Sequence, residues 1–418
     1  MSLQKILLDK TIVRGGSWLF FERFIFILKG ILLSLLFANV LPKEVFGAYQ
    51  FAASIIGVAC VFALPGMATA IIQGVARGMG GTLTIAVAQM FRYAFFGAVF
   101  LLCAALYVSL KEPNIGKILL FTAPILPFYA VVVGSWRAYL TGKEHFSEAA
   151  KVGITGELLV LLAMVGAVFF WPKAEGLIMV MILVPTLFYG TYLLRYLRSS
   201  TQEPSDESNL SFGKRLSWLY GIGVLASYLD KIIIGYFLGF AELALFTIAS
   251  IIPDQIRDSI RVLVGFVLPG FSRMGDTVAN RKLILKGIFW LFLLVTFGVL
   301  VYISLAPWLF SLLFPKYPEA ISYTQVAALA SLTVPFMILD SYFRALKDDQ
   351  TATRVALSGY FIGTVANIIF IPLFGIWGAI AARALSLGVN AALFLLAFLR
   401  KGFFEPTNLV DSVATKTR

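Results

Sequence analysis

The sequence predicts an all-α integral membrane protein with about twelve transmembrane helices. Three observations support this fold class. Hydrophobic residues make up 60% of the chain and charged residues 13%, whereas soluble domains carry about a quarter charged residues. The mean hydropathy is +0.89, and a soluble protein has too little interior to bury that much apolar surface. The apolar residues also gather in long runs that short polar segments separate.

Each run of about 20 mostly apolar residues is a candidate span, because that length crosses the hydrocarbon core of a bilayer. The first half of the chain contains the candidates Gly16–Val40, Gly47–Ile72, Ile85–Leu110, Ile118–Leu140, Val152–Trp171 and Gly176–Leu197. The second half contains Leu216–Leu238, Ala241–Phe271, Leu283–Leu305, Ile321–Leu346, Thr353–Leu373 and Gly375–Leu399. The first candidate is too long for a signal peptide and has no cleavage pattern after it, so we expect it to remain as a span.

The net charge of +12 is explained by the loops and does not indicate nucleic-acid binding. Most of the Lys and Arg residues outside the spans fall on one side of the predicted membrane, together with both termini. The loops on the other side contain only the basic residues Lys43, Lys111, Lys117, Lys173 and Lys316. Because Lys and Arg accumulate in cytoplasmic loops, both termini are predicted to be cytoplasmic.

The residues that enzymes and metal centres need are scarce. Cys60 and Cys103 lie in apolar runs, and His145 is the single histidine, in a polar loop. We therefore expect no disulfide, no metal site, no cofactor and no catalytic residues. The sequence also lacks a Walker motif, which argues against intrinsic ATP hydrolysis.

A polar segment divides the spans into two halves. Residues 199–213 (SSTQEPSDESNLSFG) are rich in Ser and acidic residues, and we expect a disordered cytoplasmic linker there. It would separate an N-terminal six-helix bundle, residues 1–198, from a C-terminal six-helix bundle, residues 214–400, with a cytoplasmic tail at 401–418.

Short echoes between the halves predict a pseudo-two-fold repeat around a central cavity, the arrangement in which transporters bind substrate between repeats. The echoed pairs are Arg137-Ala138 with Arg344-Ala345, and Pro172 and Gly176 with Pro372 and Gly375.

Charged residues inside the predicted spans are the candidate substrate site, because a charge near the bilayer centre costs at least ~2.5–3.5 kcal/mol and needs a cavity or a partner. The basic candidates for substrate binding are Arg23, Lys29, Lys231, Arg257 and Arg261. The acidic candidates, with a possible role in coupling, are Glu22, Asp230, Asp254, Asp258 and Asp340.

The eighth predicted span has the densest group of these charges. Asp254, Arg257, Asp258 and Arg261 follow i, i+3, i+4, i+7 spacing and form one polar stripe on a helix. One interpretation is a water-filled cavity for a phosphate-bearing ligand, since arginine binds phosphate oxygens through a planar fork. The other is a set of structural ion pairs that hold helices in register. The spacing alone is compatible with both.

Four segments resemble polysaccharide transporters of the multidrug/oligosaccharidyl-lipid/polysaccharide exporter superfamily. The first, LPKEVFGAYQFAASIIGVACVFALPGMATAIIQGVARG, contains Gly47, Tyr49 and Gly66. The others are WRAYLTGKEHF at 136–146, LDKIIIGYFLGFAELALFTIAS at 229–250 and NIIFIPLFGIWGAIAARALS at 367–386. The last segment has a Pro-x-x-Gly-x-x-Gly-Ala turn, and the resemblance extends over essentially the whole chain.

The resemblance is to Wzx-like O-antigen and capsule flippases. It implies two six-helix bundles around a cationic cavity, which Arg23, Lys29, Lys231, Arg257 and Arg261 would line. The implied activity is translocation of undecaprenyl-pyrophosphate-linked oligosaccharide to the outer leaflet of the bacterial inner membrane by alternating access. The implied partners are that substrate, membrane lipids and a polysaccharide polymerase, with the chain acting as a monomer. The driving force and the sugar stay open.

Three other functions are compatible with a chain of this kind. A cation-coupled multidrug antiporter of the same superfamily shares the helix plan but has different motifs. A lipid II-type flippase of peptidoglycan precursors usually has additional spans, for which this chain has no room. A membrane glycosyltransferase or polymerase typically needs acidic residues in sizeable outward loops, and the outward loops here are short.

Overall fold

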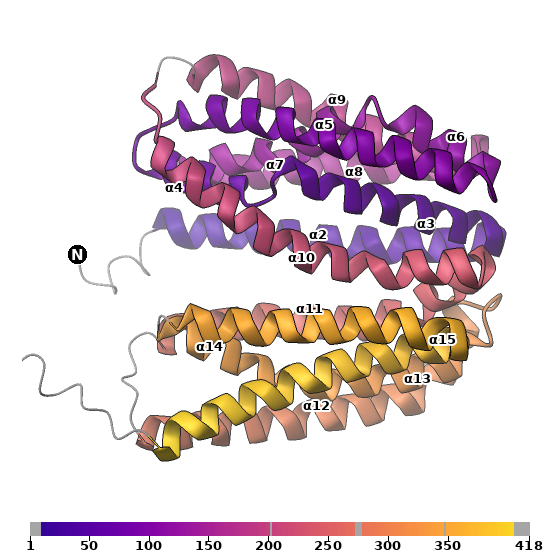
Figure 1. Ribbon diagram of the computed structural model, residues 1–418, viewed down its shortest axis with the longest axis vertical. Coiled ribbons are helices and arrows are strands. Elements are labelled where there is room, and N and C mark those ends of the chain that lie inside the picture. The colour runs from indigo at the N-terminus through magenta and orange to yellow at the C-terminus, as the bar shows by residue number, and fades with distance from the viewer. Residues whose placement is uncertain (1–9, 201–202, 272–277, 347, 405–418) are drawn as a thin grey trace, which may run out of the picture. The chain divides into compact units, whose positions relative to one another are not determined.

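The computed structural model describes residues 10–200, 203–271, 278–346 and 348–404, and their side chains except at 10–17, 19–20, 259–271, 278–279, 349 and 401–404. Across these ranges the regular elements are all helices, with no strand (Figure 1). A helix satisfies its own backbone hydrogen bonds, so it can cross a bilayer without help from water. The chain is a multi-pass all-α membrane protein, as its composition predicts.

The helices follow the predicted spans closely. The first half contains α2 (Lys10–Val40), α3 (Lys43–Ala59), η1 (Cys60–Ala63), α4 (Met67–Ala76), α5 (Thr82–Ser109), α6 (Pro113–Thr122), α7 (Leu126–Gly142), α8 (Phe146–Phe170) and α9 (Ala174–Ser200). The second half contains α10 (Glu207–Phe237), α11 (Phe240–Phe271), α12 (Val278–Leu313), α13 (Ala320–Leu329), η2 (Ala330–Phe336), α14 (Met337–Ala345) and α15 (Asp349–Phe404).

Nine helical segments in the described ranges are long and apolar enough to cross a membrane, and the pair α6 and α7, bent by 60° at its break, makes up to ten. The segment in α15 contains two of the predicted spans, and α11 covers another. The predicted layout of about twelve helices is consistent with this arrangement.

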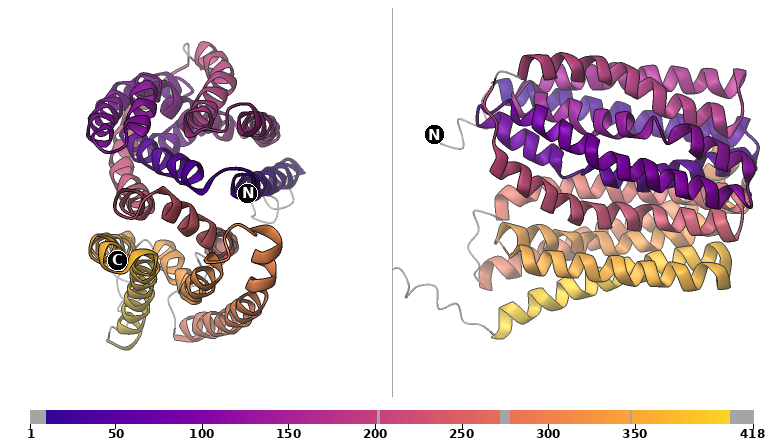
Figure 2. Two further views of the ribbon diagram at one scale, coloured as in Figure 1. Left: turned by 90° about the vertical axis from the view of Figure 1, so that its right-hand side faces the viewer. Right: turned by 45° about the horizontal axis from the view of Figure 1, so that its top comes forward.

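The chain forms two compact units, which are described separately. The first unit comprises Met1–Ile248 with Leu313–Lys316, and the second comprises Ala249–Leu312 with Tyr317–Arg418. Within each unit the helices run side by side in nearly the same or opposite directions (Figure 2). Because α10 packs against α3 and α4, it belongs to the first unit, and the boundary lies in α11. The division of the chain into bundles at 1–198 and 214–400 stays a prediction.

Glycines line the contact between α10 and the α3–α4 segment (Figure 1). A Cβ on Gly66 would lie 2.5 Å from the backbone nitrogen of Ser217, and one on Gly213 would lie 2.8 Å from Met67 Sδ. The Gly66 N–H donates a hydrogen bond to Ser217 Oγ at 3.0 Å. Small residues let helix backbones approach this closely, and close packing is what holds helices together in lipid.

The Pro-x-x-Gly-x-x-Gly-Ala turn explains the shape of α15. Gly375 has φ 61° and ψ −138°, a conformation that is essentially restricted to glycine. Gly378 lies against the carbonyl of Phe370, where a Cβ would clash. The helix therefore turns back at Gly375 into two antiparallel halves (Figure 1), which are the two predicted spans that end at Leu373 and begin at Gly375.

The expectation of a disordered linker at 199–213 is wrong for residues 203–213. Residues 207–213 form the first turns of α10, and the Asp206 carboxylate caps that helix by accepting from the Asn209 N–H at 3.1 Å. Glu203 pairs with Lys143 at 3.0 Å, and Asp206 pairs with Arg77 at 3.0 Å. The Ser- and acid-rich composition that suggested disorder thus supplies a helix cap and two ion pairs.

The electrostatics of Asp206 fit this role. The Ser208 hydroxyl, the Asn209 N–H and Arg77 all stabilise the charged carboxylate and lower the pKa of Asp206 below its usual value. The helix dipole also favours a negatively charged side chain at a helix N-terminus.

Candidate functional site

Two acid–base pairs connect α2 to its neighbours within the first unit. Glu22 accepts both guanidinium arms of Arg137 from α7, one of them at 2.6 Å. Lys29, two turns further along α2, pairs with Glu157 of α8. Gly153 on α8 has no side chain, which leaves room for the Glu22 carboxylate. Glu22 and Lys29, seven residues apart on one helix, thus both reach α8, and both meet partners on other helices.

A pocket with one lysine in its lining, here called the first-unit pocket, lies between α3, η1, α7 and α10. Its volume is about 460 Å³, and the charged residue that lines it is Lys231. The polar groups around Lys231 come from Gln50, Ser54, Tyr129 and Tyr228. Lysine and hydroxyl groups that line a cavity inside apolar helices can bind an anionic, hydrogen-bonding group.

The other charges predicted near this region have different surroundings. Asp230 is buried, and its carboxylate accepts from the Lys231 backbone N–H at 2.7 Å. Arg23 is exposed, with its guanidinium 5.2 Å from the centre of the Phe26 ring. The assignment of these residues to a substrate site stays a prediction.

In the second unit, two arginines share one carboxylate. Arg257 pairs with Asp254 on the same helix, α11, and Arg383 reaches Asp254 from the second half of α15 at 3.2 Å. Arg257 is buried, and Asp258 is half-buried. Within the stripe of the eighth predicted span, the structure shows the pairing of Asp254 with Arg257, and Asp258 lies on the same helix. The side chain of Arg261 lies outside the described residues, and the role of the stripe stays a prediction.

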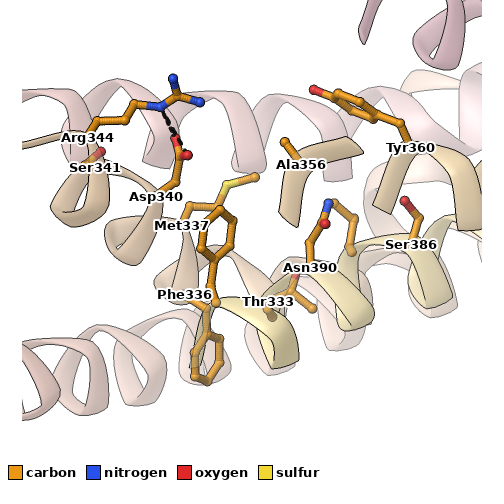
Figure 3. A pocket seen from close by; sticks show the side chains of 13 residues that line it. Thr333, Phe336, Met337, Asp340, Ser341, Arg344, Ala356, Tyr360, Ser386 and Asn390 are labelled. Carbon is orange, nitrogen blue, oxygen red and sulfur yellow. Dashed lines mark hydrogen bonds and ion pairs between the residues drawn. The ribbon is translucent and has the colours of Figure 1, made fainter. Parts of the chain in front are cut away.

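A second polar pocket, the second-unit pocket, lies between η2, α14 and the two halves of α15 (Figure 3). Its volume is about 360 Å³. Asp340 and Arg344 form an ion pair on one side, with Arg344 Nε 3.0 Å from Asp340 Oδ2. Tyr360 and Asn390 face each other across another part of the lining (Figure 3).

Asn390 has an unusual environment in this pocket. Its Oδ1 atom is buried and accepts no hydrogen bond from any described residue. One turn earlier, Ser386 donates to the carbonyl of Gly359 at 2.8 Å. A buried amide oxygen without a partner costs about 1–3 kcal/mol. This oxygen lies against Gly359, where an added Cβ would come within 2.1 Å of it.

Several of these residues are absent from the site predicted from the sequence. Asp340 is among the predicted acids, but Arg137, Glu157, Arg383 and the pocket residues Tyr360, Ser386 and Asn390 are not. A signal for the pocket does exist in the sequence. Ser386 and Asn390 are four residues apart on one helix face, and Gly359 and Gly363, with the same spacing, lie opposite them.

The described side chains do not contain a group of three or more His, Cys, Asp or Glu residues that could hold a metal ion. The carboxylates of both units instead meet Arg and Lys on neighbouring helices. The geometry is therefore that of polar pockets and ion pairs in an apolar helical scaffold, which suits binding and movement of a polar solute.

The comparison with protein families shows to which family the chain belongs. A family described as "Polysaccharide biosynthesis protein" matches residues 12–275, more than half of the 418 residues. The chain belongs to this family. A search of curated protein sequences found no match for this chain.

Solved structures with the same fold are transporters. The structure "Lipid II flippase MurJ, inward closed conformation" is 14% identical, with a TM-score of 0.66, and the match covers 93% of this chain and 90% of that one. The inward-facing structure of a multidrug resistance MATE family transporter of the MOP superfamily is 14% identical, with a TM-score of 0.67 and coverage of 93% and 95%. Its outward-facing counterpart is 15% identical, with a TM-score of 0.61 and coverage of 98% and 97%. At such identities the likeness shows the fold alone.

These findings confirm the predicted family and fold class. The chain has the fold of MOP-superfamily transporters, and its structural neighbours are transporters and flippases rather than enzymes.

Proposed function

We propose that this protein is a flippase that moves undecaprenyl-pyrophosphate-linked oligosaccharide from the cytoplasmic to the outer leaflet of the bacterial inner membrane by alternating access. The product would serve O-antigen or another surface polysaccharide. The family links the chain to polysaccharide biosynthesis, and the fold is that of membrane transporters. A pyrophosphate head with sugar hydroxyls cannot cross hydrocarbon unshielded, because each polar group would lose its hydrogen bonds to water.

The second-unit pocket is the observation that carries this proposal. Hydroxyl, amide, carboxylate and guanidinium groups line it together, and sugars present both hydrogen-bond donors and acceptors to such groups. Thr333, Ser341, Tyr360 and Ser386 contribute its hydroxyl groups, and Asn390 contributes its amide.

The cations of both units supply the chemistry for the pyrophosphate. Arg257 and Arg383 already hold a carboxylate, Asp254, in the geometry in which they could hold a phosphate group. Lys231 lines the first-unit pocket as a compact point charge. Arg23, Lys29 and Arg261 stay predicted contacts, and Glu22, Asp230, Asp258 and Asp340 stay predicted coupling acids. We also propose that the protein acts as a monomer among membrane lipids and supplies a polymerase.

The test is complementation of a bacterial strain that lacks its own oligosaccharide flippase. The wild type should restore surface polymer. The double variant Tyr360→Phe with Asn390→Leu removes two hydrogen-bonding groups from the second-unit pocket, and leucine keeps the number and branching of the heavy atoms in the Asn390 side chain. With each lost bond worth about 0.5–1.5 kcal/mol, we expect the rate of restoration to fall about tenfold.

The control is Tyr220→Phe, which removes the hydroxyl of a tyrosine that is 45% exposed and should leave the rate unchanged. Protein amounts in the membrane are compared by immunoblot. If the double variant were as active as the wild type, the pocket would not hold the sugar. If the wild type restored no surface polymer with any sugar lineage tested, the flippase function itself would be rejected.

A cation-coupled multidrug antiporter is the second candidate function. It is favoured by the fold shared with the multidrug transporters and by the carboxylates of Glu22, Glu157 and Asp254 inside apolar helices. Efflux of a cationic dye, measured in cells without their own efflux pumps, distinguishes the two. Dye efflux without surface-polymer restoration would support the antiporter.

A further inference from the structure

An apolar groove, here called the first-unit groove, runs between α5, α10 and the α3–η1 segment. Its volume is about 480 Å³. Its lining includes Phe62, Phe96, Trp218 and Ile222, and a lysine, Lys214, closes the end nearest the start of α10. Trp218 is 78% exposed and Phe96 62% exposed, so in a membrane this groove faces the lipid.

The groove and the first-unit pocket are neighbours that share one wall residue, Val61. Gly221 of α10 also lines the groove and touches this residue, because an added Cβ there would lie 2.7 Å from Val61 Cγ1. Beyond this contact α10 turns Val224, Tyr228 and Lys231 toward the pocket. The contact between Val61 and Gly221 is thus part of the wall between a pocket that contains Lys231 and an apolar groove that faces lipid.

The backbone is irregular beside Val61. The α-helix α3 gives way to the 3₁₀ turn η1, which ends at Leu64 with φ 57°, a strained value for a residue with a side chain. Pro65 follows, and α4 begins at Met67. Val61 thus lies in the last turn of the span Lys43–Ala63, where the α-helix tightens into a 3₁₀ turn before the chain bends at Leu64.

We infer that the Val61–Gly221 contact is a lateral gate, and that the first-unit groove takes the isoprenoid chain of the substrate while the phosphate lies in the first-unit pocket at Lys231. This inference rests on the proposed function. The substrate is amphipathic, with an anionic head joined directly to a branched hydrocarbon chain. A polar cationic pocket next to an apolar lipid-facing groove matches that order of groups.

The positions of the two lysines agree with this path. Lys214 and Lys231 are both on α10 and 17 residues apart in number, which is about 25 Å along a helix. The hydrocarbon core of a bilayer is about 30 Å thick. A phosphate that moves from Lys214 to Lys231 would thus cross most of the membrane while the chain stays in the groove. A phospholipid that merely coats the surface would need no polar pocket behind Val61.

Photocrosslinking tests the occupant. The protein is reconstituted in vesicles of phosphatidylethanolamine and phosphatidylglycerol with a small fraction of undecaprenyl phosphate. Benzoylphenylalanine replaces Trp218 in the groove, or, as the matched control, Trp308 of α12, which is 62% exposed. We expect crosslinks at position 218 to be enriched in undecaprenyl phosphate about tenfold over its mole fraction, as for a site that prefers it, with no enrichment at position 308.

Substitution tests the gate. Gly221→Leu places a side chain in the contact with Val61 and should lower the restoration of surface polymer about tenfold, as overpacking of a tight contact does. Gly298→Leu on α12 is the control, because a Cβ there meets nothing within 4 Å. Val61→Ala with Gly221→Ala removes the methyl groups of Val61 and adds one methyl group at Gly221, so the contact is not overpacked and the variant should stay active. This variant separates a blocked gate from a misfolded protein.

The outcomes separate the two proposals. If the wild type restores surface polymer, but Gly221→Leu is equally active and both crosslinking positions label phospholipid alike, the gate is wrong and the flippase stands. If the wild type restores nothing with any sugar lineage, the flippase is wrong, whatever the groove binds.

Discussion

Glu22 shows how a single charged residue is accommodated in an apolar span. Its side chain is 8% exposed, and the fork of Arg137 binds both of its oxygens from α7. Gly153 of α8 provides the space. The helical spacing of Glu22 and Lys29 predicts that they share a face, but it cannot identify their partners, because Arg137 and Glu157 are more than a hundred residues away in the sequence.

Removing Arg137 should therefore destabilise the protein. Arg137→Leu leaves the Glu22 carboxylate buried without its counter-charge. Breaking a fully buried pair costs about 3–5 kcal/mol, and the Arg137 side chain is 41% exposed, so we expect a smaller loss of about 2 kcal/mol. The measurement is the thermal unfolding midpoint of the detergent-purified protein.

Two further variants make this result specific. Glu22→Leu with Arg137→Leu removes both charges and should recover most of the lost stability, because an apolar pair can replace a buried ion pair. Arg92→Leu changes an exposed arginine and should have little effect. A double variant as unstable as the single one would contradict the role of the pair.

The breaks in the helices follow local sequence signals. Pro124 lies in the bend between α6 and α7, Pro335 lies within η2, and Gly375 divides α15. Proline and glycine act through the backbone of their own segment. The turn at Gly375 agrees with the boundary between two predicted spans, whereas the predicted spans Ile118–Leu140 and Ile321–Leu346 run through Pro124 and Pro335 without a break. The order of residues 203–213 cannot be predicted from their own composition, because it depends on Lys143 and Arg77, which lie in distant loops.

The turn in α15 should depend on Gly375. Its φ of 61° with ψ of −138° excludes other residues at a cost of about 1–3 kcal/mol, so Gly375→Ala should lower the unfolding midpoint. Gly388→Ala in the same helix is the matched control. A Cβ at Gly388 meets nothing within 4 Å, and alanine favours helix over glycine. Equal midpoints for the two variants would show that the turn tolerates a side chain.

At the scale of the whole molecule, hydropathy and charge carry most of the predictable information. The spans, their order and the transporter fold follow from runs of apolar residues and a few motifs. The polar pockets do not, because each collects side chains from several helices, as Tyr360 and Asn390 do. The compact units also depend on packing, since the small residues of α10, such as Gly213, fit it against α4 rather than against the helices that follow it in the sequence.

The loop charges predict the orientation of the whole chain, with both termini in the cytoplasm. His145 and Lys173 lie in the connections at opposite ends of α8, and both are exposed. In a background in which Ala replaces Cys60 and Cys103, His145→Cys and Lys173→Cys are treated with a membrane-impermeant maleimide in intact cells. We expect labelling of Lys173→Cys at once and of His145→Cys only after permeabilisation. The reverse pattern would invert the orientation and the proposed direction of transport.

The glycines between α10 and the α3–α4 segment have a consequence for how this protein tolerates genetic variation. Gly66, Gly213 and Gly221 fill gaps that no side chain fits, whereas Gly287 and Gly298 on α12 border open space. In a saturation-mutagenesis library under selection for surface polymer, the glycine codons would form two classes. Codons for glycines in tight contacts would stay glycine, here called the fixed class, and codons for glycines beside open space would accept other residues. The fixed class alone would trace the line along which α10 lies on α3 and α4, so selection would record a helix contact that the hydropathy of the chain does not reveal.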